Sequence, residues 1–261
     1  MQTAIDKAWC QTDVMLSIEN LLRCGGQIAD LMFPPQCVLC GCLDNPAPVC
    51  ERCLAILPLN QHACRRCAEP LEHRTLEDGL LDDAICGRCL VDPPEYRRTI
   101  SPMLYQFPVS TAIKSLKFGG GLWYLPLLAS WLAAAMEPVR AEVDALVPVP
   151  LHYLKHGLRG FNQARELALL LSRQTGLPVM NGARRIRSTA PQSDLTADAR
   201  ADNMCGAFAV DSRLRFERLL IVDDVMTTGE TCAALTRALT QAGAKEVSVL
   251  TVARAPAPGG T

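Results

Sequence analysis

Two adjacent aspartates, Asp223 and Asp224, stand out as a candidate ligand-binding pair. They follow the apolar run LLIV at 219–222 and precede the small polar stretch TTGET at 227–231. Neighbouring carboxylates suit a vicinal diol, which donates one hydrogen bond to each, or a hydrated magnesium ion. Threonine hydroxyls and backbone amides at the start of a helix suit a phosphate. Together these preferences describe a ribose 5-phosphate.

Gly229 within this stretch would let the backbone approach a phosphate closely, because glycine has no Cβ atom. The same residues also fit a simpler interpretation, in which the aspartates cap a helix and Thr-Thr-Gly forms a turn. The sequence contains no GxxxxGK[ST] motif, which disfavours a nucleoside triphosphatase of the P-loop class.

Cysteine is concentrated in the first third of the chain, where eleven of the thirteen cysteines precede residue 90. Eight of them form four CxxC pairs, which are separated by nine, ten and eighteen residues: Cys37/Cys40, Cys50/Cys53, Cys64/Cys67 and Cys86/Cys89. Two intervening residues allow both thiolates of a pair to reach one tetrahedral ion, and a second pair completes the shell. We therefore predict that these cysteines bind zinc, at up to two ions per chain, and that the metal stabilises this module.

The cysteine pattern leaves several points open. A disulfide framework and a redox role are the alternatives to zinc, although disulfides are disfavoured in a cytoplasmic chain. Sequential pairing of the CxxC motifs closes the shortest loops, but interleaved pairing is also compatible with two ions. Cys42 could compete as a ligand and is expected to be spare. The isolated cysteines are expected to be small buried side chains: Cys10, Cys24, Cys205 and Cys232.

From residue 96 onward, short apolar runs alternate with helical patterns. The patterns predict strands at 144–150, 218–222 and 247–252 and helices at 161–175 and 230–242. Gly176 and Gly243 are expected to end the two helices. Alternation of this kind indicates an α/β fold with a mostly parallel sheet covered on both faces. Ligands of such folds bind beyond the carboxyl ends of the strands, where residues 223–229 are expected to form a loop.

The stretch LLIVDDVMTTGET at 219–231 resembles the phosphoribosyl-diphosphate (PRPP) signature of type I phosphoribosyltransferases. The resemblance implies that the two aspartates bind the ribose hydroxyls, that the threonines and the glycine cradle the 5-phosphate, and that magnesium accompanies PRPP. The residues it implicates in PRPP binding are Asp223, Asp224, Val225, Met226, Thr227, Thr228, Gly229, Glu230 and Thr231.

Further stretches narrow the resemblance to one branch. VPVPLHYLKHGLRGFNQARELA at 147–168 and RIRSTAPQSDLTADARADNMCGAF at 185–208 are similar to the ComF family of competence-associated proteins. The upstream LMFPPQCVLCG at 31–41 is similar to the zinc-binding module of that family. The resemblance implies that a mobile segment after the strand at 147–149 meets the pyrophosphate, through Pro150, Lys155, Arg159, Gly160, Phe161, Asn162 and Gln163.

The sequence therefore predicts a parallel-sheet, type I phosphoribosyltransferase-like domain with a small N-terminal zinc-ribbon-like module. The expected parts are an N-terminal helical extension at 1–30, a cysteine-rich, double zinc-ribbon-like module at 31–95, a phosphoribosyltransferase-like domain at 96–254 and a disordered tail at 255–261.

Basic residues gather at 148–190, which holds seven Lys or Arg against the single Glu166, although the net charge of the chain is −1. This segment is a candidate anion-binding face, and a solvated basic surface has the same composition. The candidate hood over an acceptor base, at 178–215, contains a single aromatic residue, Phe208. Because it offers no base-stacking platform, the sequence supports PRPP binding better than it supports transfer.

The composition, with 49% hydrophobic and 20% charged residues, fits a globular protein. The chain has no run of about eighteen apolar residues, so no transmembrane segment is expected. Its acidic, interrupted N-terminus does not fit a signal peptide, and a cytoplasmic location is expected.

Three functions are compatible with these patterns. The first, implied by the ComF resemblance, is a DNA-uptake protein that works with competence-machinery proteins, retains a PRPP site and binds single-stranded DNA through its zinc module and basic face. The second is an active phosphoribosyltransferase that acts on an unidentified base or amine, and the third is a zinc-stabilised scaffold. Aromatic content is only 5%, and the few candidates for base stacking are of types usually found in the core: Tyr96, Phe118, Trp123 and Tyr124.

Overall fold

The computed structural model divides the chain into two compact units, Met1–Ala55 and Ile56–Thr261. The residues that the structure describes are 36–43, 47–71, 84–118, 120–151, 161–186, 206–211 and 214–256. Several predictions concern residues outside this set: the extension at 1–30, residues 257–261 of the tail, Cys10, Cys24, Lys155, Arg159, Gly160 and Cys205.

The first unit has little apolar core among its described residues. An antiparallel bridge between Gln36 and Leu43 closes a tight turn, and one short helix follows, α2 (Glu51–Ala55). The buried side chains are those of Cys37, Val49 and Cys53. So small a core fits a module whose stability comes from bound metal.

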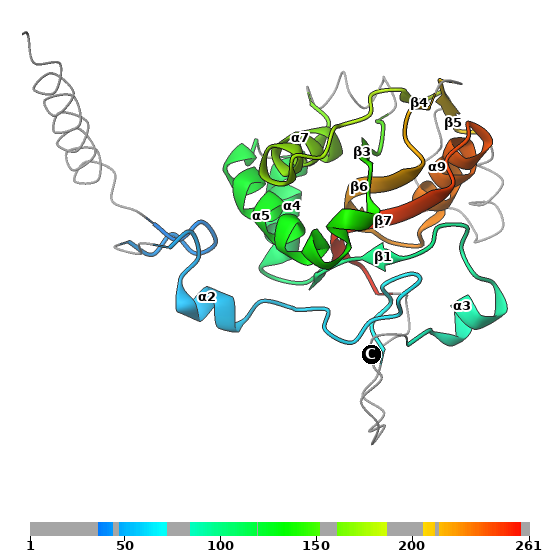
Figure 1. Cartoon of the computed structure of the whole chain (residues 1–261). Helices are drawn as coiled ribbons and strands as arrows, with labels where there is room; N and C mark the ends of the chain where they lie inside the picture. Colours follow the sequence, from blue (N-terminus) through cyan, green and yellow to red (C-terminus); the bar gives the residue numbers. More distant parts are fainter. Residues whose placement is uncertain are drawn as a thin grey trace, which may run out of the picture. The chain divides into compact units, whose positions relative to one another are not determined.

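The second unit is built on a parallel sheet, as predicted, and its strand order is β1-β7-β6-β3 (Figure 1). Its strands are β1 (Thr99–Ile100), β2 (Met103–Leu104), β3 (Ala145–Pro148), β6 (Arg218–Met226) and β7 (Glu246–Arg254). The short strands β1 and β2 both pair with β7, and β6 pairs with β3 on its other side.

Helices cover both faces of the sheet (Figure 1). The main helices are α4 (Val109–Phe118), α5 (Leu125–Met136), α7 (Gln163–Thr175) and α9 (Glu230–Gln241). Leu219 and Ile221 of β6 pack in the core formed with α9, whereas Leu220 and Val222 pack in the core formed with α4, α5 and α7. Because successive side chains of a strand point to opposite faces, the two aspartates that follow are divided in the same way.

Strand β6 runs to Met226, whereas the sequence predicted an end at Val222. The additional part pairs with β7, with Asp223 opposite Thr251. The predicted loop at 223–229 is therefore wrong in its first half: the aspartates belong to the strand, and only residues 227–229 separate it from α9.

Polar residues and glycines define the ends of the helices. Helix α7 begins at Gln163, two residues later than predicted, because the side chain of Asn162 caps it by accepting the backbone N–H of Arg165 at 3.4 Å. Gly176, with φ of +76°, ends α7 as expected, and Gly243 follows α9.

Smaller elements complete the unit. They are α3 (Gly87–Val91), η2 (Leu122–Tyr124), η3 (Glu137–Glu142) and an antiparallel pair in the candidate hood, β4 (Ala183–Arg185) with β5 (Phe208–Val210).

One helical stretch among the described residues, Leu122–Glu142, is long and apolar enough to cross a membrane by length and composition. Its side chains Leu128, Ala129 and Leu132 are fully buried in the core beside the sheet. Core packing therefore accounts for part of its apolar character, and the absence of a transmembrane segment stays a prediction.

Candidate functional site

The eight paired cysteines form two separate clusters, and within each the sulfur atoms lie within 4.8 Å of one another. The first cluster consists of Cys37, Cys40, Cys50 and Cys53, and the second consists of Cys64, Cys67, Cys86 and Cys89. Sequential pairing is therefore confirmed, and interleaved pairing is excluded. Cys42 lies outside both sets, and the isolated Cys232 is buried, as expected.

The geometry of each cluster fits a zinc ion. The Sγ atoms of Cys40 and Cys50 are 3.7 Å apart, and so are those of Cys67 and Cys86. Four thiolates at about 2.3 Å from a tetrahedral zinc ion would lie about 3.8 Å from one another. All cysteines of the described residues are free thiols, so the structure supports metal ligation rather than a disulfide framework.

Both clusters repeat one turn, in which the first cysteine accepts a backbone N–H from the third. Cys50 donates its N–H to Cys37 Sγ at 3.4 Å, and Cys86 donates to Cys64 Sγ at 3.3 Å. Burial alone would raise the pKa of Cys37, but the N–H groups around its sulfur lower it overall. Contact with Cys67 is the main cause that lowers the pKa of Cys64. Each cluster thus stabilises a thiolate, the form that binds metal.

The acidic pair meets a different cation on each face of the sheet. On the α4 side, Lys117 Nζ lies 2.8 Å from Asp224 Oδ1, and the two side chains are only 21% and 8% exposed. On the opposite side, the positive charge of Arg185 from β4 acts on Asp223. The structure therefore surrounds the two carboxylates with counter-charges that the sequence did not assign to them.

The pKa of Asp223 is raised to about 7 by burial and by the negative charge of Asp224. Lys117, Arg185 and the backbone N–H of Asp224, which donates to Asp223 Oδ1 at 2.9 Å, act in the opposite direction. Such a carboxyl group is partly protonated near neutral pH. A diol or a cation that binds it would favour the ionised form, so ligand binding here is expected to depend on pH.

Gly229 shapes the loop between β6 and α9. Its φ of +88° lies in the left-handed region, and a Cβ atom there would lie 2.8 Å from the hydroxyl oxygen of the buried Tyr96. Both the conformation and the space therefore require glycine. Thr228 Oγ1 accepts the backbone N–H of Glu230 at 3.5 Å, while Thr227 is exposed. Hydroxyls and amides thus gather at the positive end of a helix of 12 residues, an arrangement that suits a phosphate.

The predicted pyrophosphate side lies on the neighbouring strand. Beyond β3, Val149 donates its N–H to the carbonyl of Val222 at 3.0 Å, and Pro150 follows. Asn162 Nδ2 donates to the carbonyl of Val149 at 3.0 Å. The adjacent Gln163 is buried, and its Nε2 atom has no hydrogen-bond partner among the residues that the structure describes. An amide in that state suits an oxygen-rich ligand.

Aromatic side chains are arranged differently from the expectation. Phe208 of the hood is buried, and the guanidinium of Arg185 lies 5.7 Å from the centre of its ring, so it is not available for base stacking. Phe118 and Trp123, expected in the core, are instead 77% and 60% exposed. They lie at and just beyond the end of α4, the helix that carries the lysine paired with the acidic pair.

The basic segment does not form one uniform face within the described residues. Arg184 is ion-paired with Asp211 at 2.9 Å, and both side chains are exposed. Arg185 lies over the ring of Phe208, and its charge lowers the pKa of Asp223; Arg187 lies outside the described residues. Part of the predicted basic face therefore belongs to the site itself.

Two charged residues of this region have no counterpart in the sequence motifs. Lys117 pairs with the second aspartate, and Arg254 at the end of β7 hydrogen-bonds to the carbonyls that lead into the loop at 227–229, here named the phosphate loop. A lysine within an amphipathic helix and an arginine near a chain end are ordinary in sequence. No local signal could have assigned either of them to the site.

Two family models match the two regions of this chain. Residues 28–90 match the double zinc ribbon domain, and residues 159–260 match the phosphoribosyl transferase domain. A solved purine phosphoribosyltransferase from Pyrococcus horikoshii aligns with 51% of this chain and 73% of its own, with a TM-score of 0.33 and 18% identity.

Several relatives align with 65% to 79% of this chain. The DNA utilization protein YhgH of Salmonella typhimurium is 32% identical over 212 residues, which cover 79% of this chain and 90% of the relative. Competence protein F of Haemophilus influenzae is 32% identical over 179 residues, covering 65% and 78%. Competence protein ComFC of Bacillus subtilis is 26% identical over 215 residues, covering 79% and 84%. The chain therefore belongs to the ComF/YhgH family of competence and DNA-utilization proteins, with a double zinc ribbon and a phosphoribosyltransferase domain.

Proposed function

We propose that this protein binds PRPP with magnesium at the carboxyl edge of its sheet and acts in DNA uptake in the cytoplasm, where it binds single-stranded DNA beside competence-machinery proteins. The observation that carries the PRPP part is the acidic pair at the end of β6, followed at once by the left-handed Gly229 and the N-terminus of α9. Asp223 and Asp224 would accept the ribose hydroxyls, and the loop would hold the 5-phosphate. The relatives, a competence protein and DNA utilization proteins, support the DNA-uptake part.

Lys117 is assigned the role of an internal counter-ion. It neutralises Asp224 while the site holds no ligand, and its ammonium group would turn to the phosphates of PRPP once magnesium and the ribose approach the carboxylates. The exchange keeps the buried carboxylate paired throughout, which avoids the cost of an isolated buried charge.

Calorimetric titration with PRPP and magnesium tests the ligand. The wild-type protein should bind, and Asp223→Asn with Asp224→Asn should abolish binding. The matched control is Asp211→Asn, because Asp211 is an exposed carboxylate of the hood, and it should bind as the wild type does. Unchanged PRPP affinity in the double variant would refute the assignment of the loop.

The pH dependence of the same titration follows from Asp223. Because its pKa is near 7, the ionised fraction rises about tenfold between pH 6 and pH 8, and PRPP affinity should rise with it. The single variant Asp223→Asn should flatten this part of the profile. It should also not lower the unfolding temperature at pH 8, because a carboxyl group with a raised pKa destabilises the fold when it ionises.

The exposed aromatic residues favour α4 as part of the DNA surface. Lys114 and Phe118 are four residues apart on one face of the helix, both are exposed, and the exposed Trp123 follows. Bases stack on exposed aromatic rings regardless of sequence, and a nearby ammonium group attracts the phosphates. This surface adds the stacking that the hood lacks.

Fluorescence anisotropy with a labelled single-stranded oligonucleotide measures the DNA affinity. Phe118→Ala with Trp123→Ala should weaken binding by about tenfold or more. Phe107→Ala removes another aromatic residue, 69% exposed, and should have little effect. Affinity should fall as salt rises, because phosphate contacts release counterions. Salt-independent affinity would eliminate the DNA part, and pyrophosphate release from PRPP with a base or an amine would instead identify a phosphoribosyltransferase.

A further inference from the structure

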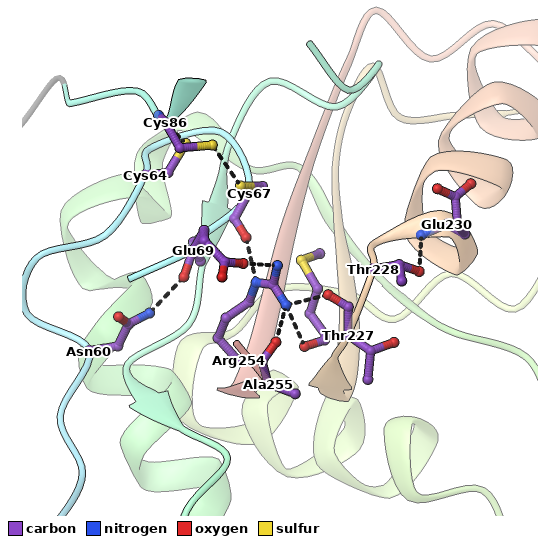
Figure 2. Close-up of polar contacts among 12 residues, drawn as sticks. Asn60, Cys64, Cys67, Glu69, Cys86, Thr227, Thr228, Glu230, Arg254 and Ala255 are labelled. Carbon is purple, nitrogen blue, oxygen red and sulfur yellow. Dashed lines mark hydrogen bonds and ion pairs between the residues drawn. The ribbon is translucent and has the colours of Figure 1, made fainter. Parts of the chain in front are cut away.

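Arg254, the last residue of β7, is a charged side chain with only 1% of its surface exposed. Its guanidinium group lies between the second cysteine cluster and the loop that follows β6 (Figure 2). A guanidinium carries five N–H donors and keeps its charge, so a buried arginine requires a nearly complete set of acceptors. Arg254 obtains them from two segments that are far apart in the sequence and from the carbonyl of the adjacent Ala255.

On the cluster side, Arg254 Nε donates to the carbonyl oxygen of Cys67 at 2.9 Å, and Nη2 forms an ion pair with the carboxylate of Glu69. Cys67 is one of the four thiols that fit zinc, so the turn that wraps the metal also directs its carbonyl. Ala68 donates its N–H to the carbonyl of Cys64 at 2.7 Å and closes this turn. The acceptors on this side therefore depend on the shape that the metal imposes.

On the loop side, Arg254 Nη1 donates to the carbonyl oxygens of Met226, at 3.2 Å, and Thr227 (Figure 2). Ala255 donates its N–H to the carbonyl of Met226 at 2.9 Å, which ties the end of β7 to the same point. The two carbonyls belong to the peptide groups that lead into Gly229. Fixing their direction fixes the path by which the backbone enters the phosphate loop.

We propose that zinc in the second cluster sets the conformation of the phosphate loop, with Arg254 as the positioning residue that connects them. Loss of the metal relaxes the turn and displaces the carbonyl of Cys67 and the carboxylate of Glu69. A buried guanidinium cannot remain without those partners, so it moves, and the loop carbonyls that it holds move with it. The effect on PRPP affinity rests on the proposed function, whereas the effect on the loop does not.

The coupling has a reciprocal consequence. If zinc in the second cluster tightens PRPP binding by a given factor, then PRPP tightens zinc binding there by the same factor. A competing chelator of known affinity should therefore remove less zinc from the second cluster at equilibrium when PRPP is present. The first cluster provides an internal control, because its four cysteines belong to the other compact unit.

Hydrogen exchange of the full chain, read by mass spectrometry on peptides covering 224–231, tests the connection. Three variants should accelerate exchange in the loop by about tenfold or more and weaken PRPP binding by a similar factor: Arg254→Lys, Glu69→Gln and Cys86→Ser. Cys40→Ser should remove the first zinc ion, measured by elemental analysis, and leave loop exchange and PRPP affinity unchanged.

Each result supports or overturns the proposal. If Cys86→Ser does not fold, Arg254→Lys and Glu69→Gln decide, because both keep all eight thiols. Wild-type loop exchange in Arg254→Lys, or equal acceleration in Cys40→Ser, would overturn the connection. A wild-type protein that shows no PRPP binding, yet shows loop exchange controlled by the second cluster, would refute the proposed ligand and leave the connection standing.

Discussion

The two cysteine clusters share one turn but have different surroundings. An antiparallel bridge closes each turn, between Gln36 and Leu43 in the first and between Ala63 and Pro70 in the second. The first turn belongs to a unit with few buried apolar residues among those that the structure describes, whereas the second belongs to the unit that contains the sheet. We therefore expect the same metal chemistry to stabilise the first unit and, in the second, to support the loop after β6 as well.

One position of the turn has a different residue type in the two clusters. Gly41 occupies the left-handed region with φ of +73°, and the equivalent residue of the second turn is an alanine, Ala68, with φ of +54°. Ala68 is buried, and its carbonyl accepts a hydrogen bond from Asn60 Nδ2 at 2.9 Å. A strained residue persists where its surroundings over-determine the conformation. Packing around the second turn thus holds the left-handed conformation that glycine allows in the first.

The largest expected difference follows the loss of thiols. Cys64→Ser with Cys67→Ser should lower the unfolding temperature of the sheet-containing unit, at a cost of about 5 kcal/mol or more, because bound metal contributes folding energy. Cys50→Ser with Cys53→Ser should unfold the first unit and leave the unfolding temperature of the sheet-containing unit unchanged. Calorimetry and elemental analysis measure both outcomes. Cys42→Ser, which removes a thiol outside both clusters, should retain two zinc ions. Equal changes in the unfolding temperature of the sheet-containing unit for the two double variants would contradict the distinction between the clusters.

The next effect concerns the loop that the second unit contains. Gly229→Ala should destabilise this unit by about 2 kcal/mol or more, because it adds a clash with the hydroxyl of Tyr96 to a left-handed conformation. Gly176→Ala is the matched control, since its φ is +76° and the nearest atom would lie at 3.6 Å, and it should cost about 1 kcal/mol. Chemical denaturation measures both. Zinc in the first cluster should be retained, and a cost for Gly229→Ala no larger than that of the control would contradict the close contact.

A smaller effect is expected at the contact that ties the second turn to the sheet. Asn60 Nδ2 donates to the carbonyls of Ala68 and Ser101, at 2.9 and 3.2 Å. Asn60→Ala should therefore cost about 1 to 2 kcal/mol and accelerate zinc loss from the second cluster alone. Gln61→Ala, at the exposed neighbouring position, should be neutral. The rate at which a chelator removes zinc, followed with a chromogenic zinc indicator, measures this effect. Faster zinc loss from both clusters would contradict the prediction.

The smallest effects exchange the residues of the two turns. Gly41→Ala should destabilise the first unit by about 1 kcal/mol, because alanine is strained at a positive φ. Ala68→Gly relieves the same strain in the second turn but increases the entropy of the unfolded chain, so its stability should change by less than about 1 kcal/mol. Thermal unfolding of the two single variants measures the asymmetry. If Gly41→Ala and Ala68→Gly destabilised the protein equally, the two turn positions would not be equivalent.

Local periodic patterns account for what could be predicted. The helices at α7 and α9 and the strands β3, β6 and β7 were recognisable because apolar spacing reflects burial on one or both faces. Loop length favoured the sequential grouping of the CxxC pairs, since neighbouring pairs close the shortest loops, but only the structure excluded the interleaved grouping. The same local reading placed the acidic pair at the carboxyl edge of the sheet.

Features that depend on distant neighbours could not be predicted. Strand β6 extends past Val222 because β7 continues beside it, and no property of the DDVM stretch alone shows that. Lys117 and Arg254 meet the site through elements that the fold brings together. The exposure of Phe118 and Trp123 depends on what covers the end of α4, so the core position predicted from residue type alone was wrong.

The contact between Arg254 and Cys67 joins residues 187 positions apart in the chain. Strand β7 also lies between β1 and β6, so these strands cannot share a sheet until the end of the chain is available. Contacts of such long range form late in folding, and domains are made from the N-terminus during synthesis. The second cysteine cluster is therefore synthesised well before its guanidinium partner. A zinc ribbon that could look independent in the sequence is thus completed only after β7 has been made.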